Sequence, residues 1–189
     1  TLNVAFTDVK AQVVPDDNGV LLFSDCTFTS YGTVFNGTVL QATGTRAPYV
    51  QLDRCDFIGD GTFASASLYL AYATAVLRDV TFTNASYCSV SPGYLFVDNV
   101  VSDHSTQFGL NLGSDSDLFI DNVTVTNASF GGLELSGDTR NGTNVLIGPN
   151  VTLQGNNFPV HLTIAGLYAA SNIPATGNTN NMIHVSEFA

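Results

Sequence analysis

The sequence is poor in basic residues, with one methionine and no tryptophan. Lysine and arginine together number five against sixteen aspartates and glutamates, which gives a formal net charge of −11. A surface with that charge repels the phosphates of nucleic acids and of anionic membranes, so we predict no nucleic-acid partner. No apolar run reaches about 18 residues, so no membrane-spanning helix is predicted either. This acidic composition is typical of proteins that are secreted or displayed at a cell surface.

Signals for helices are almost absent. Charged residues make up only 11% of the chain, which leaves few residues to form the solvent-facing side of a helix. Short β-branched runs closed by Gly, Asn, Asp and Ser dominate instead, and such runs are typical of strands and turns. The apolar fraction of 44% is too high for a disordered chain. The composition therefore favours an all-β fold with a packed core.

A six-residue phrase recurs along the chain. Its clearest copy is Asn-Val-Thr-Val-Thr-Asn at residues 122–127, and related copies begin at residues 3, 25, 54, 79, 99 and 150. Successive copies are separated by 22, 29, 25, 20, 23 and 28 residues. Repeats of that length are typical of solenoids, in which each repeat buries its apolar face against the next.

Each repeat contains three short strand signals. An alternating apolar triplet precedes the phrase, a bend such as Asp98-Asn99 or Asp121-Asn122 follows the triplet, and the phrase itself forms the second strand. Asn and Asp suit a repeated bend because they tolerate left-handed backbone angles. The third strand has the form Leu-x-Leu, as in Leu110-Asn111-Leu112 and Leu133-Glu134-Leu135.

Equivalent positions of the repeats share side chains that belong inside a core. One inward column of the second strand contains Phe6, Phe28, Phe57, Phe82, Ser102, Val125 and Leu153. Stacked repeats would place these side chains about 4.8 Å apart, and Ser102 would then need a hydrogen-bond partner. The columns predict a right-handed parallel β-helix of about seven three-strand rungs, with a β-sandwich as the alternative. We interpret residues 1–189 as a single domain, a mature piece or fragment of a longer chain.

The phrases Asp-Asn-Val-Thr-Val-Thr-Asn, at residues 121–127, and Gly-Gly-Leu-Glu-Leu, at residues 131–135, carry a resemblance. They resemble repeats of the right-handed parallel β-helix proteins that bacteria secrete or display, the pectin-lyase-like superfamily. The resemblance implies an extracellular β-helix. It leaves the activity open, because such proteins include pectin-degrading enzymes, adhesins and passive stalks.

The outward row of the third strand is the main candidate ligand-binding surface. In chain order it consists of Gln41, Tyr69, Ser89, Asn111, Glu134, His161 and His184. A line of amide, carboxylate, imidazole and phenol groups could bind an extended polysaccharide through hydrogen bonds and stacking on Tyr69. The alternative is a solvated face with no ligand.

Catalysis is a second hypothesis for this row. Glu134 beside His161 could act as an acid–base pair of a polysaccharide lyase or glycoside hydrolase. The sequence motifs of the pectin-degrading enzymes are missing, since the chain contains neither Gly-His-Gly nor Arg-x-Lys. We therefore predict a binding or presentation module without its own chemistry and keep the enzyme as the alternative.

Other interpretations stay open at this point. Acidic residues recur at the bends, including Asp53, Asp98 and Asp121, and stacked acids could bind calcium. The plainer explanation is bend chemistry, so we predict no cofactor and no other metal. Interrupted Thr-x-Thr pairs leave an ice-binding surface as a minor alternative. Open strand edges at the ends of a β-helix favour a structural stalk with end-to-end contact to further chain or another copy.

Three cysteines leave at least one unpaired. Cys26 and Cys55 occupy the same repeat position in successive copies, so they are either two stacked core thiols or a disulfide between neighbouring turns. Cys88 belongs to the third strand, and we expect it to be buried.

Overall fold

The computed structural model describes residues 5–7, 11–13, 20–29, 38–43, 49–61, 67–71, 74–85, 88–91, 94–113, 117–136, 145–163, 173 and 176–186. Every regular element in these ranges is a β-strand, which confirms the predicted all-β class. Within the same ranges, the chain contains no helix with the length and hydropathy that crossing a membrane would require.

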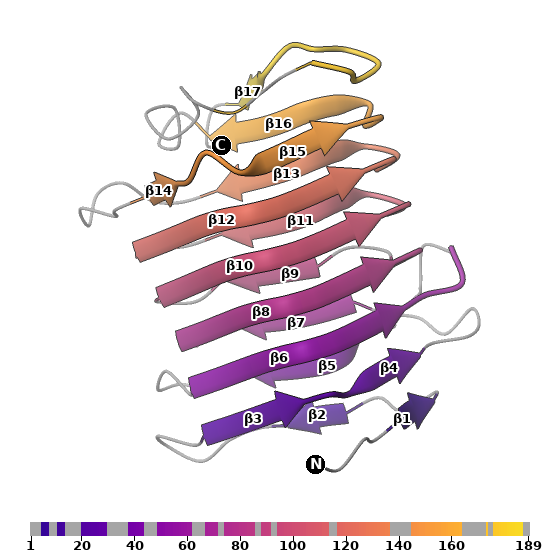
Figure 1. Cartoon of the computed structure of the whole chain (residues 1–189), viewed down its shortest axis with the longest axis vertical. Helices are drawn as coiled ribbons and strands as arrows, with labels where there is room; N and C mark the ends of the chain where they lie inside the picture. The colour runs from indigo at the N-terminus through magenta and orange to yellow at the C-terminus, as the bar shows by residue number, and fades with distance from the viewer. Residues whose placement is uncertain are drawn as a thin grey trace.

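The strands form two sheets (Figure 1). The nine-stranded sheet consists of β1 (Ala5–Thr7), β3 (Val20–Ser24), β4 (Thr27–Thr29), β6 (Tyr49–Ile58), β8 (Thr74–Thr83), β10 (Tyr94–Asp103), β12 (Asp117–Thr126), β14 (Val145–Ile147) and β15 (Val151–Gln154). The eight-stranded sheet consists of β2 (Ala11–Val13), β5 (Thr38–Thr43), β7 (Ser67–Ala71), β9 (Cys88–Ser91), β11 (Phe108–Gly113), β13 (Gly131–Ser136), β16 (Phe158–Thr163) and β17 (His184–Ser186).

The chain winds as a parallel β-solenoid. From β4 to β13 it alternates between the two sheets, and each strand pairs in parallel with the strand one turn away. This arrangement confirms the parallel β-helix and excludes the β-sandwich, whose sheets are antiparallel. Figure 1 shows the long strands of the nine-stranded sheet in front of the short strands of the other sheet.

The number of strands in a turn differs from the prediction. Four consecutive turns each contain one ten-residue strand, β6, β8, β10 or β12, where two separate strands were predicted. The strands pair in the same register before and after the bend. The first two predicted strands of each of these turns are therefore one bent strand. Only toward the ends of the stack are they separate, as β3 with β4 and β14 with β15. The solenoid therefore has about four regular turns instead of about seven three-strand rungs.

The bend is built by left-handed residues at equivalent positions. The backbone angle φ is 56° at Asp25, 51° at Arg54, 54° at Asp79, 53° at Asn99 and 50° at Asn122. Asn and Asp adopt this region more readily than most residues. Two successive bend residues face outward, so the apolar residues on both flanks point inward, and the whole ten-residue strand contributes to the core.

The predicted phenylalanine column lies in that core. The ring centroids of Phe28 and Phe57 are 4.6 Å apart with an interplanar angle of 9°, and those of Phe57 and Phe82 are 4.9 Å apart at 18°. All three side chains are buried. Ser102 continues the column and donates a hydrogen bond of 3.0 Å to the carbonyl oxygen of Gly109, which supplies the expected partner.

Cys26 and Cys55 are free, buried thiols. The Cys26 thiol lies 3.4 Å from the carbonyl oxygen of Ser24, and the Cys55 thiol lies 3.5 Å from that of Asp53. Burial raises the pKa of Cys55 to about 11, so the thiol stays protonated at neutral pH. The structure thus corresponds to the stacked-thiol alternative. The side chain of Cys88 lies outside the described residues.

The acidic residues at the bends contact hydrogen-bond donors of neighbouring side chains. Arg54 contacts Asp25 and Asp53, each at 2.7 Å. Further along the stack, between β10 and β12, the Asn122 amide donates a 2.8 Å hydrogen bond to Asp98. In the part of the chain that the structure describes, no group of three or more His, Cys, Asp or Glu side chains could hold a metal ion. These contacts favour bend chemistry over a calcium ladder.

Because of Asp103, we expect the stability of the solenoid to vary with pH in the acidic range. Its carboxylate accepts hydrogen bonds from Thr126 Oγ1 at 2.6 Å and Asn127 Nδ2 at 3.0 Å, and His104 Nδ1 lies 2.8 Å away. Burial alone would raise the pKa of Asp103, but these three contacts outweigh it and hold the pKa below the ordinary 3.8.

Because the folded-state pKa of Asp103 is depressed, its stabilising contribution is complete above pH 3.8 and is lost as the pH falls below that value. We therefore expect the Tm to fall on acidification through this range, and to fall less in Asp103→Asn than in the native chain. Thermal unfolding followed by circular dichroism between about pH 2 and pH 7 measures both curves. Parallel curves would show that Asp103 does not contribute.

Candidate functional site

The predicted polar row is a continuous line of partners in the eight-stranded sheet. Each residue is the Cα partner of the next, in the order Gln41, Tyr69, Ser89, Asn111, Glu134, His161 and His184. The side chains of Gln41, Tyr69 and Ser89 lie outside the described residues. The site can therefore be built from Asn111, Glu134, His161 and His184.

A hydrogen-bonded network joins three of these side chains. Asn111 Nδ2 donates to Glu134 Oε2 at 2.5 Å, and His161 Nδ1 lies 3.2 Å from Glu134 Oε1. The side chains of Glu134 and His161 are only 20% and 22% exposed. An ionised carboxylate can only accept, so His161 Nδ1 is the donor of this contact. The Nε2 atom of His161 is then the ring nitrogen that can meet a ligand.

A glycine places Phe108 on the same outer face as Asn111. Strict alternation would put residues three positions apart on opposite faces. Here Gly109 and Leu110 both point inward and are both buried. A Cβ on Gly109 would lie 2.1 Å from Val125 Cγ1, so only glycine fits there. The double inward step leaves Phe108 and Asn111 together on the outside.

Three phenylalanines and the two histidines form an aromatic cluster on this face. Phe130 meets Phe108 edge to face at 5.0 Å and Phe158 at 5.3 Å. The ring of Phe108 stacks on His161 at 5.8 Å, and that of Phe158 stacks on His184 at 4.8 Å. Gly131 makes room for the cluster, because a Cβ there would lie 2.6 Å from Phe158 and 2.9 Å from Phe108.

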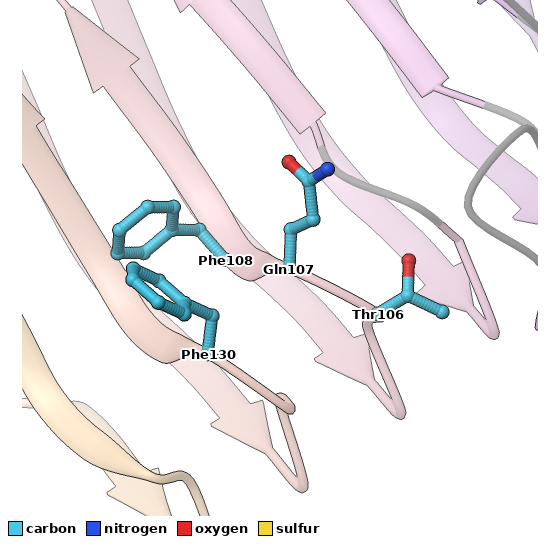
Figure 2. A pocket seen from close by; sticks show the side chains of 4 residues that line it. All are labelled: Thr106, Gln107, Phe108 and Phe130. Carbon is cyan, nitrogen blue, oxygen red and sulfur yellow. The ribbon is translucent and has the colours of Figure 1, made fainter.

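A pocket of about 290 Å³ opens beside the cluster. It is lined by Thr106, Gln107, Phe108 and Phe130, as Figure 2 shows. Phe130 is 51% exposed, so part of its ring is available to a ligand. Phe108 lines the pocket and also stacks on His161, which makes the pocket continuous with the polar row.

Sequence reasoning missed the aromatic half of this site. A signal was present, because an aromatic residue stands three positions before the row in Phe108 and Phe158 and four before it in Phe130. Regular alternation of side chains along a strand would place a residue three positions before the row on the inner face. Two successive inward residues bring these rings to the outer face, at Gly109 and Leu110, at Gly132 and Leu133, and at Pro159 and Val160.

The row brings together the two residues of the predicted acid–base pair. Glu134 Oε1 and His161 Nδ1 are 3.2 Å apart, a distance across which an acid–base pair could pass a proton. Glycoside hydrolysis by the usual mechanism also needs a second carboxyl group within about 5–10 Å of the first. Glu134 is the one carboxylate in the row, and its two oxygens are occupied by Asn111 and His161.

Comparison of the chain with models of protein families, with curated proteins and with solved structures finds no match. The strand pairing itself defines the class of this protein, a parallel β-solenoid. The resemblance to the pectin-lyase-like superfamily is therefore confirmed only as far as a parallel β-solenoid, and no relationship to that superfamily is shown.

Proposed function

We propose that this chain is a secreted or cell-surface module that binds a neutral polysaccharide on the outer face of its eight-stranded sheet. The observation that carries the proposal is the continuity of the Asn111–Glu134–His161 network with the pocket at Phe130. Sugars present hydroxyl groups around their edges and apolar C–H groups on their faces. A row of amide, carboxylate and imidazole groups beside an exposed aromatic ring complements both.

The charge of the protein selects among polysaccharides. With a net charge of −11, the surface repels polyuronates and sulfated chains. Glu134 adds a carboxylate to the site itself, where it accepts hydrogen bonds well but disfavours an anionic sugar. We therefore infer a neutral ligand, whose binding should change little with salt because no charges are neutralised.

The row runs along the solenoid across several strands, which favours an extended ligand. Asn111, Glu134, His161 and His184 lie on four consecutive strands, β11, β13, β16 and β17. Parallel neighbours are about 4.8 Å apart, so the four residues span about 14 Å along the solenoid. A linear oligosaccharide along this line would contact several rungs at once.

The Phe130→Ala substitution tests this proposal. A screen of neutral oligosaccharides, including glucan, mannan and galactan fragments, identifies the best ligand, and calorimetry gives its Kd for each variant. We expect Phe130→Ala to weaken binding by about tenfold or more, because burial of a phenylalanine ring contributes about 1.5–3 kcal/mol. Asn111→Ala should weaken it severalfold through a lost hydrogen bond.

Tyr94→Ala is the matched control. Tyr94 is an exposed aromatic residue, 42% accessible, but it belongs to β10 of the other sheet. Its substitution should leave the Kd unchanged. Equal losses in Phe130→Ala and Tyr94→Ala, or no loss in Phe130→Ala, would refute the proposed surface. Mass spectrometry of the ligand after incubation should show the intact oligosaccharide, whereas shortened products would favour the catalytic alternative.

A further inference from the structure

The chain has three histidines, and the fold brings two of them together. His161 and His184 are Cα partners on β16 and β17, with ring centroids 6.4 Å apart. The third, His104, directly follows β10 of the other sheet and contacts Asp103. The pairing of His161 with His184 therefore depends on the register of the eight-stranded sheet.

We propose that His161 and His184 bind one divalent transition-metal ion, of the kind that prefers imidazole ligands, such as Cu²⁺, Zn²⁺ or Ni²⁺. The protein supplies two ligands, and solvent completes the coordination. Calcium does not fit the pair, because it prefers several oxygen ligands.

The contact with Glu134 determines which nitrogen atom of His161 is available to a metal ion. Its Oε1 lies 3.2 Å from Nδ1, so Nε2 is the nitrogen that faces a metal ion. Histidines that bind metals commonly donate their other N–H group to a carboxylate, which fixes the ring orientation and makes the ligating nitrogen more basic. Asn111 in turn holds Glu134 through the 2.5 Å hydrogen bond to Oε2. The row therefore already contains the supporting groups of a metal ligand.

The aromatic cluster orients the ring of His161 before any metal binds. Phe108 stacks on His161 with an interplanar angle of 15°, and Phe158 stacks on His184 with an angle of 23°. Two nitrogens on one ion stand about 3–4 Å apart, since each metal–nitrogen bond is about 2.0–2.1 Å long. The two ring centroids are 6.4 Å apart, so the proposed site requires the exposed His184 side chain to leave its stack on Phe158 and rotate toward Nε2 of His161.

Metal binding is independent of the proposed sugar binding, because it needs no sugar and can be measured alone. Sugar binding measured with and without a chelator separates the two proposals. Failure of one leaves the other standing.

The test is a titration of the untagged protein with Cu²⁺ by calorimetry, together with electron paramagnetic resonance of the bound ion. The native chain should bind one Cu²⁺ with two imidazole nitrogens in the spectrum. His184→Ala should weaken binding by about tenfold or more, and Glu134→Gln by about 10- to 100-fold, the usual effect of removing a supporting group. His104→Ala should bind like the native chain.

His184 is on the surface, so its substitution should leave the circular dichroism spectrum unchanged, and loss of binding cannot then be attributed to unfolding. The proposal is overturned if the native chain binds no Cu²⁺. It is also overturned if His184→Ala binds as tightly as the native chain, or if His104→Ala removes the site.

Discussion

Phe57→Ala is expected to lower the free energy of unfolding by about 3–5 kcal/mol, the usual cost of deleting a buried phenylalanine ring. Phe57 is fully buried and stacks on Phe28 on one side and on Phe82 on the other. Its removal opens a cavity in the middle of the column and leaves both neighbours without a stacking partner. Denaturant unfolding followed by circular dichroism measures the change.

Ile58→Ala is the control for this experiment. Ile58 is the next residue of β6 and is 37% exposed on the outer face of the sheet. Its substitution should cost less than about 1 kcal/mol, since surface changes rarely have large effects. If the two variants were equally stable, Phe57 would not lie in a stacked core.

Asn156→Ala is expected to cost about 2–5 kcal/mol. The side chain is completely buried at the turn between β15 and β16. Its Oδ1 accepts a 2.8 Å hydrogen bond from the backbone N–H of Ala128, and its Nδ2 donates a 3.1 Å bond to the carbonyl oxygen of Val125. Alanine leaves both backbone groups buried without partners, at about 1–3 kcal/mol each.

The neighbouring Asn157→Ala is the matched comparison. Asn157 is exposed, and its backbone N–H bond to Ala128 survives the substitution. Thermal unfolding of both variants should show a large decrease in Tm for Asn156→Ala and little change for Asn157→Ala. An unchanged Tm in Asn156→Ala would mean that the side chain does not join these two turns.

The solenoid could be predicted because its side chains repeat. Phe28, Phe57 and Phe82 occupy the same place in successive copies, and stacking is the arrangement that buries all three rings against one another. The bend was also predictable, since Asn99 and Asn122 have the left-handed backbone angles that their residue type favours. The order of the polar row followed from the same register.

The number of strands and the aromatic cluster could not be predicted by the same reasoning. A bend signal suggests a break between strands, but pairing resumes directly beyond Arg54 and Asn99, so one strand continues through the bend. Phe108 was missed because Gly109 and Leu110 both point inward, which breaks the period of two. Packing of Gly109 against Val125 of the following strand, β12, causes this double inward step, and the local sequence does not reveal that contact.

A crystal structure of the protein with a bound neutral oligosaccharide is the most direct test of the proposed function. We predict sugar density against Phe130 and Gln107 that extends along Asn111, Glu134 and His161 on the outer face of the eight-stranded sheet. Density confined to the nine-stranded sheet, or none at a saturating concentration of the best ligand, would contradict it.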